Sequence, residues 1–166
     1  MTLLLWLSLI PLFAAADRIV GSDMKNPKSL GNGLVIVPIA AMSVLGAWGG
    51  VAMAAAWLVY RNIPWVIGGT TTPRTTRQAL GALARHSMPC AAAAICWLSG
   101  LLPGGAVFAF LLYAPLVTVL DIYRASDVDA RAHFGLEENL CLNAEIELFR
   151  GALFGSALAL TLIGMR

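Results

Sequence analysis

Charged residues are absent from four long stretches of the chain, and apolar side chains dominate those stretches. No Asp, Glu, Lys or Arg occurs in residues 1–16, 29–60, 86–120 or 151–165. The hydrocarbon core of a bilayer is about 30 Å thick and selects apolar helices of about 20 residues, because a spanning segment must satisfy its own backbone hydrogen bonds. The pattern therefore predicts an all-α, polytopic integral membrane protein.

Turn signals divide these stretches into a small bundle of about five transmembrane helices. A Leu-Pro-Gly-Gly turn at residues 102–105 interrupts the longest apolar run and predicts a helical hairpin. A re-entrant hairpin that does not cross the membrane is the alternative for residues 87–122. The expected helices cover residues 2–16, 34–60, 87–102, 105–122 and 148–165.

The first apolar segment is short and allows two interpretations. Its end, Ala14-x-Ala16, resembles a signal-peptidase site, but its start has no basic residue, which favours a retained helix. This helix either spans the membrane or lies in the interface. In the second case four transmembrane helices remain.

Length and composition indicate one membrane domain covering residues 1–166. The sequence is 59% hydrophobic, and roughly 70 residues remain outside the expected helices, too few for a separate soluble domain. A net charge of +2 gives no indication of a nucleic-acid partner. Cys90, Cys96 and Cys141 lie in or beside expected helices, which indicates buried thiols and no disulfide framework.

The distribution of Lys and Arg predicts an orientation. With five helices, loops 61–85 and 124–150 share one side and carry seven arginines, whereas the other side has four basic residues. Basic loops stay on the cytoplasmic side. This bias predicts an N-terminus on that side of a bacterial inner membrane or an organelle inner membrane.

A polar stripe leads into the last expected helix. Asn139, Asn143, Glu147 and Arg150 recur at spacings of four, four and three residues, so they share one helix face. A charge at the membrane boundary is costly alone, and Glu147 and Arg150 are predicted to form an ion pair there, with Arg150 snorkelling to the headgroups. The alternative is that the stripe lines a transport path.

Carboxylates at the end of the fourth expected helix are the other candidates for chemistry. Asp121, Asp127 and Asp129 form a cluster of carboxylates, but their spacing matches no metal-binding loop. His86 and Cys90, four residues apart, supply only two ligands, so no metal is predicted. Nucleotide-binding and redox motifs such as GxGxxG, Walker A and CxxC are absent from the sequence, and no cofactor is predicted. The weak catalytic candidates are Asp121, Asp127 and Glu147.

Small residues recur at four-residue spacing in two expected helices. Gly46 and Gly50 form one row, and Gly151 and Gly155 form another. Rows of this kind let helix backbones approach closely in a membrane, where van der Waals contact drives association. Both rows therefore predict helix packing, either within the protein or with a partner.

Three functions fit these features. The packing rows, the polar segment 124–148 and the lack of a convincing acid–base pair favour a non-catalytic structural or assembly subunit of a larger membrane complex. Its expected partners are the lipid bilayer and other membrane protein subunits. The alternatives are a membrane-embedded enzyme acting on lipid or a lipid-linked substrate, which is less favoured, and a small transporter or pore.

Overall fold

A computed structural model describes residues 2–21, 27–67, 75–133 and 140–165, and side chains within 2–21, 29–63, 75–126 and 145–165. It is 88% helical with no strands among these residues, which confirms the all-α class. The helices are α1 (Thr2–Leu7), α2 (Leu9–Val20), α3 (Pro27–Val44), α4 (Trp48–Ile67), α5 (Thr76–His86), α6 (Met88–Leu98), α7 (Gly105–His133) and α8 (Leu140–Ile163).

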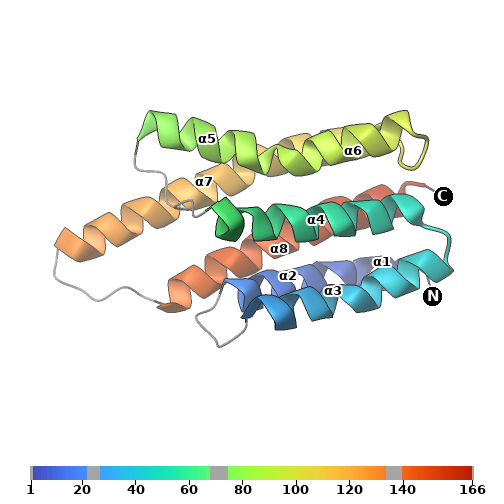
Figure 1. Cartoon of the computed structure of the whole chain (residues 1–166), viewed down its shortest axis with the longest axis horizontal. Helices are drawn as coiled ribbons and strands as arrows, with labels where there is room; N and C mark the ends of the chain where they lie inside the picture. Colours follow the sequence, from blue (N-terminus) through green and yellow to red (C-terminus); the bar gives the residue numbers. More distant parts are fainter. Residues whose placement is uncertain (1, 22–26, 68–74, 134–139, 166) are drawn as a thin grey trace.

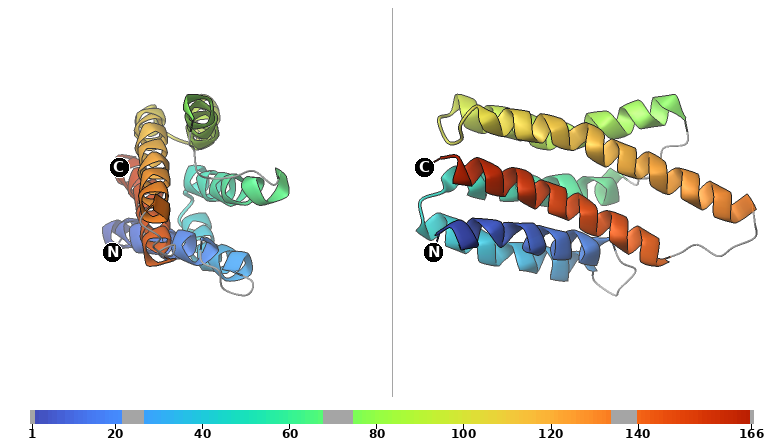
Figure 2. Two further views of the ribbon diagram at one scale, coloured as in Figure 1. Left: turned by 90° about the vertical axis from the view of Figure 1, so that its left-hand side faces the viewer. Right: turned by 180° about the vertical axis from the view of Figure 1, so that it is seen from behind.

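The helices lie along the long axis of the bundle (Figures 1 and 2). Helix α1 continues into α2 and α5 into α6 in the same direction, and the chain otherwise reverses direction from one helix to the next. Both termini lie at one end, called here the terminal end, together with the turns that join α3 to α4 and α6 to α7. The opposite end is called the polar end. Among the residues that the structure describes, three segments are long and apolar enough to cross a membrane, namely Thr2–Val20, Gly105–Ser126 and Glu145–Ile163, and Ser29–Val44 is a shorter apolar helix.

The expectation of a single helix over residues 34–60 is wrong. The chain folds there into a helical hairpin, in which α3 ends at Val44 and α4 begins at Trp48. Gly46 adopts a φ of 73° in the turn, a left-handed conformation that glycine reaches without steric cost. The turn is as apolar as the helices that it joins, so hydropathy alone did not mark it.

Other helix ends differ from expectation because polar residues continue the helices. Helix α2 continues beyond residue 16 to Val20, and α7 continues to His133. Helix α8 begins at Leu140 rather than 148. The segment added to α7 contains Ala and Arg, and the segment added to α8 contains Leu, Ala and Glu, which have high helix propensity outside a membrane as well. The expected turn at 102–105 does separate α6 from α7.

An aromatic cluster forms the centre of the bundle. The ring of Phe154 on α8 lies 5.0 Å from Phe13 on α2, 5.1 Å from Phe110 and 5.8 Å from Tyr113 on α7, centroid to centroid. Trp57 on α4 packs edge-on against Phe13 at 5.3 Å. All five rings are buried. They join four helices in the apolar part of the molecule.

The glycine row of α8 lies directly against the backbone of α2. A Cβ atom added at Gly151 would approach the Phe13 carbonyl oxygen more closely than the 3.0 Å that real Cβ atoms keep. At Gly155 it would lie 2.6 Å from the Leu9 carbonyl oxygen. Gly50 instead faces the flexible side chain of Met42.

Gly46 does not belong to a packing row. A Cβ atom at this position would meet nothing within 4 Å. The residue lies in the turn between α3 and α4, so its role is conformational rather than one of close contact.

Candidate functional site

Charged side chains from four helices gather inside the bundle, away from the terminal end. Counted as whole residues, none of them is more than 9% exposed, although isolated Asp, Glu and Arg residues are almost never buried to this extent. We call this set the charge network. Its members are Asp17 on α2, Arg61 on α4, Asp121 and Arg124 on α7, and Glu147 and Arg150 on α8.

The network lies deep along the helix axes. At a rise of about 1.5 Å per residue, Arg150 lies about 20 Å from the end of α8 at Ile163, and Asp121 lies about 24 Å from the start of α7. A hydrocarbon core is about 30 Å thick. If the terminal end lies at one membrane surface, the network lies within the far third of the core.

Glu147 is the acceptor at which three arginines from three helices meet. Its Oε2 accepts hydrogen bonds from Arg61 Nη2 and Arg150 Nη1, both at 2.9 Å. Its Oε1 accepts from Arg124 Nη1 at 3.3 Å. Arg61 also pairs through Nε with Asp17, which is fully buried. One carboxylate thus links α4, α7 and α8, and Arg61 extends the link to α2.

Asp121 forms the second centre of the network. Its Oδ1 pairs with Arg150 Nη2, and its Oδ2 lies 2.8 Å from His86 Nε2 and 3.3 Å from Arg85 Nη2. His86 ends α5 and is 1% exposed, whereas the Arg85 side chain is 20% exposed. The other ring nitrogen of His86, Nδ1, lies 2.5 Å from the Tyr60 hydroxyl of α4. Asp121 therefore joins α5, α7 and α8.

Charge balance explains how the network is tolerated. Its three carboxylates face three guanidinium groups, and removing one partner from a buried pair leaves a costly lone charge. His86 lies outside the three candidate spans. Burial disfavours its imidazolium form and lowers its pKa below the usual 6.5, although the hydrogen bond to Asp121 acts in the opposite direction.

A glycine makes room for the central acceptor. A Cβ atom added at Gly21, at the end of α2, would overlap Cγ of Glu147. The missing side chain lets Glu147 lie beside α2, close to the Asp17–Arg61 pair. Nothing in the sequence around Gly21 distinguishes it from an ordinary glycine after a helix, because its neighbour Glu147 is distant in the chain.

The predicted pair of Glu147 and Arg150 is present, but its surroundings differ from expectation. The two side chains interact at 2.9 Å across one helical turn. Arg150 is only 2% exposed and reaches Asp121, so it does not snorkel toward headgroups. Asp121, a catalytic candidate from the sequence, is fully buried and pairs with Arg150.

Other predicted site residues lie outside the residues whose side chains are described, namely Asp127, Asp129, Asn139, Asn143 and Cys141. The thiol of Cys90 lies 3.6 Å from the carbonyl oxygen of Val107, and Cys96 is buried. Within the described part of the chain, no group of three or more His, Cys, Asp or Glu side chains could hold a metal ion.

Sequence reasoning missed Asp17, Arg61, His86 and Tyr60 as members of one site. Asp17 and Arg61 each follow a charge-free stretch, and each was interpreted as the first residue of a loop. The available signal was that both lie within one turn of an apolar helix end, where an unpaired charge is costly.

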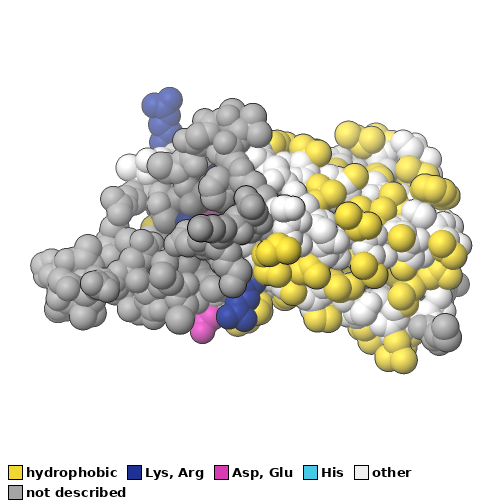
Figure 3. All heavy atoms as spheres, turned by 60° about the horizontal axis from the view of Figure 1, so that its bottom comes forward, with side chains coloured by type: hydrophobic (Ala, Val, Ile, Leu, Met, Phe, Trp, Pro, Cys, Tyr) yellow, Lys and Arg dark blue, Asp and Glu magenta, His cyan; other side chains and the backbone are white. Residues whose placement is uncertain are grey.

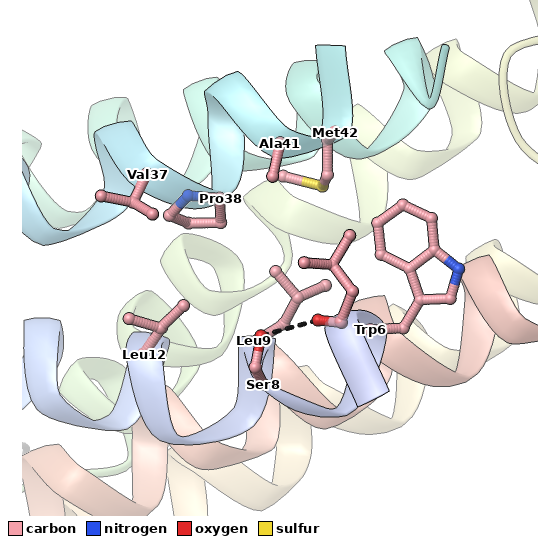
Figure 4. Close-up of a pocket in the computed structure, with 9 residues that line it drawn as sticks. Trp6, Ser8, Leu9, Leu12, Val37, Pro38, Ala41 and Met42 are labelled. Carbon is pink, nitrogen blue, oxygen red and sulfur yellow. Dashed lines mark hydrogen bonds between the residues drawn. The ribbon is translucent and has the colours of Figure 1, made fainter. Parts of the chain in front are cut away.

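A small pocket elsewhere in the molecule is apolar. It lies between α1–α2 and α3, where Trp6, Leu9, Pro38 and Met42 line it (Figure 4). The Ser8 hydroxyl donates a hydrogen bond to the Leu5 carbonyl oxygen of α1 at 2.7 Å, so this polar group already has a partner in the backbone. The pocket offers packing surface rather than chemistry.

No protein-family model, curated protein or solved structure matches this chain. The interpretation of the site consequently rests on its own geometry.

Proposed function

We propose that this protein is a non-catalytic structural or assembly subunit of a larger membrane complex. The observation that carries the proposal is the mutual pairing of the charge network. Glu147 and Asp121 are each bound by arginines from more than one helix. Charges held in this way cross-link helices at one level and give the bundle a fixed shape. They are committed to one another rather than presented to a substrate.

The proposed orientation follows from where the basic residues lie. Arg18, Arg61, Arg77, Arg85 and Arg124 all belong to the half of the molecule toward the polar end. Basic residues accumulate on the cytoplasmic side of a membrane. We therefore propose that the polar end faces that side and that both termini face the opposite side. This proposal differs from the cytoplasmic N-terminus expected from the sequence, which depended on five helices and so on termini at opposite ends.

Cysteine labelling tests this orientation. In a chain without its three native cysteines, single cysteines at Thr76 on α5 and Ser126 on α7 should react with an impermeant reagent from the same side of sealed vesicles. A cysteine at Ser99, in the turn at the terminal end, should react only from the other side. All three positions are exposed. Labelling of Thr76→Cys and Ser126→Cys from opposite sides would contradict the arrangement.

The outer surface is suited to a membrane and to partner helices. Figure 3 shows hydrophobic side chains gathered toward the terminal end, with charged side chains toward the polar end. Exposed apolar residues include Phe108 and Leu112 on α7, Ile95 on α6 and Ile36 on α3. In a bilayer such surface faces lipid or another helix without penalty.

Site-specific crosslinking tests the subunit proposal. A photoreactive amino acid placed singly at Leu112, Ile95 or Ile36 should yield, on at least one face, an adduct of defined mass with another membrane protein in native membranes. The matched control is Phe154, which is fully buried and should crosslink only within the chain. Lipid adducts alone on all three faces, together with a lone chain in native mass spectrometry, would reject the proposal.

The enzyme alternative depends on the same acids. Asp121 or Glu147 would have to leave an arginine to act as an acid or base, and Asp127 would have to join them. A variant that keeps its assembly but loses its cellular function would favour this alternative over the subunit proposal.

A further inference from the structure

Four side chains form a hydrogen-bonded series that ends at the charge network. The Tyr113 hydroxyl lies 3.5 Å from that of Tyr60, and Tyr60 lies 2.5 Å from Nδ1 of His86. Nε2 of His86 lies 2.8 Å from Oδ2 of Asp121. All four residues are buried, and they come from α4, α5 and α7.

The donors in this series have one direction when His86 is neutral. The Asp121 carboxylate can only accept, so Nε2 of His86 carries the hydrogen. Nδ1 must then accept the hydrogen bond of the Tyr60 hydroxyl, and Tyr60 in turn accepts from Tyr113. Every hydrogen in the series points toward Asp121.

The two ends of the series differ in their access to water. The Tyr113 ring packs against Phe110 and Phe154, so the series ends there in the apolar aromatic cluster. At the other end Asp121 contacts Arg85, whose side chain is 20% exposed. The series is therefore nearer to water at its Asp121 end than at its Tyr113 end. This geometry fits a binding site for a proton rather than a channel.

We propose that His86 is a proton-binding site that responds to the pH on the polar side. On acidification a hydronium ion from solvent gives one proton to Nδ1, the ring nitrogen that carries no hydrogen in the neutral form, after the hydrogen bond from Tyr60 has opened. The hydronium ion becomes water, and no covalent bond between heavy atoms changes. The Tyr60 hydroxyl then turns from donor to acceptor, and its own hydrogen points to Tyr113. Proton uptake thus reverses the hydroxyl direction of both tyrosines.

Uptake also changes the charge around Asp121. This carboxylate already faces Arg85 from α5 and Arg150 from α8, and Arg124 lies one turn away on α7. Protonated His86 adds a further cation to this cluster and no acid. Protonation strengthens the contact between His86 and Asp121, but Arg85 and Arg150 then share this carboxylate with a third cation, and repulsion among the three cations opposes that gain.

The sign of the pH effect follows from linkage. Burial of the imidazole lowers the pKa of His86 below the 6.5 of an exposed histidine. As pH falls, the unfolded chain consequently takes up this proton before the folded chain does. The stabilisation from neutral His86 is fully present above pH 6.5 and is lost as pH falls below that value toward the folded-state pKa.

Nitrogen NMR of a single-histidine chain in lipid nanodiscs tests the proposal. His133→Gln leaves His86 as the only histidine and replaces no member of the charge network. Above pH 7 the imidazole should be neutral with its hydrogen on Nε2. On acidification Nδ1 should take up one proton with a midpoint below 6.5 while the chain remains folded. A hydrogen on Nδ1 at high pH, a midpoint at or above 6.5, or a ring that stays neutral until unfolding would each overturn it.

Two further substitutions should move the midpoint in opposite directions. Tyr60→Phe removes the donor that favours neutral His86 and should raise the midpoint. Asp121→Asn removes the carboxylate that favours the imidazolium and should lower it. Tyr123→Phe is the matched control, because Tyr123 is exposed on α7 and should leave the midpoint unchanged. Shifts of Tyr60→Phe and Asp121→Asn in the same direction would reject the proposed series.

Discussion

Arg150→Gln should destabilise the folded bundle by about 3–5 kcal/mol, the typical cost of removing one partner from a buried ion pair. Arg150 is 2% exposed and binds both Glu147 and Asp121. Its loss leaves two carboxylates in a low-dielectric interior with fewer counter-charges. The stability is measured by reversible unfolding of the detergent-solubilised protein, at a pH above 7 so that His86 stays neutral.

A double-mutant cycle shows whether Asp121 and Arg150 stabilise the fold as a pair or through separate contacts. Asp121→Asn combined with Arg150→Gln should recover part of the loss, because each change removes the charge that the other leaves unpaired. The expected coupling lies within about 0.5–3 kcal/mol. Arg77→Gln is the control, since Arg77 is exposed on α5 and should change stability by less than about 0.5 kcal/mol. Strictly additive losses would show that the two side chains do not act as a pair.

The same cycle distinguishes the proposed functions. Under the subunit proposal, the double variant should recover assembly in the cell along with stability. A double variant that assembles fully but has lost cellular function would instead show that Asp121 or Arg150 is needed for its own chemistry. That result would favour the enzyme or transporter over the scaffold.

Local relations in the sequence predicted local structure well. Charge-free runs indicated apolar helices because the bilayer constraint acts on consecutive residues. Glu147 and Arg150 were predicted to pair because they lie one helical turn apart. The turn at Gly46 was missed because it contains no polar residue. It lies at the terminal end, where apolar side chains such as Val44 and Leu45 remain exposed.

The charge network could not be assembled from one sequence. The contacts of Asp17 with Arg61 and of Arg61 with Glu147 join the residues that are farthest apart in the sequence. Only the packing of α2, α4 and α8 brings them together. Each charge taken singly has the sequence context of a loop boundary. Charges buried at such depth require partners of opposite charge, so pairing of some kind could be expected from the sequence. The sequence does not show which acid pairs with which arginine.

Gly151→Leu should strongly weaken the packing of α8 against α2, and Gly151→Ala should already be destabilising. A Cβ atom at Gly151 meets the carbonyl group of Phe13 and lies 2.8 Å from Cα of Ala14. These are backbone atoms of α2, which cannot move aside without shifting the whole helix. Overpacking of this kind costs about 1–3 kcal/mol, and leucine should exceed alanine because its side chain is larger.

The effect should extend to the charge network. Asp17 lies one helical turn beyond Phe13 on α2, so a displacement of α2 also separates Asp17 from Arg61. Gly155→Ala should behave similarly, because its Cβ atom would lie 2.6 Å from the Leu9 carbonyl oxygen. Gly50→Ala should cost less, since its nearest neighbour is the flexible thioether of Met42.

Gly81→Ala provides the matched control for a glycine within a helix. Gly81 is exposed on α5, and a Cβ atom there meets nothing within 4 Å. Alanine should therefore stabilise the protein by about 0.5–1 kcal/mol through helix propensity alone. Unfolding curves of the four alanine variants should rank Gly81→Ala above the wild type and Gly151→Ala below Gly50→Ala. Wild-type stability of Gly151→Ala would show that α2 and α8 do not make this backbone contact, and the position of Asp17 in the network would then lose its structural basis.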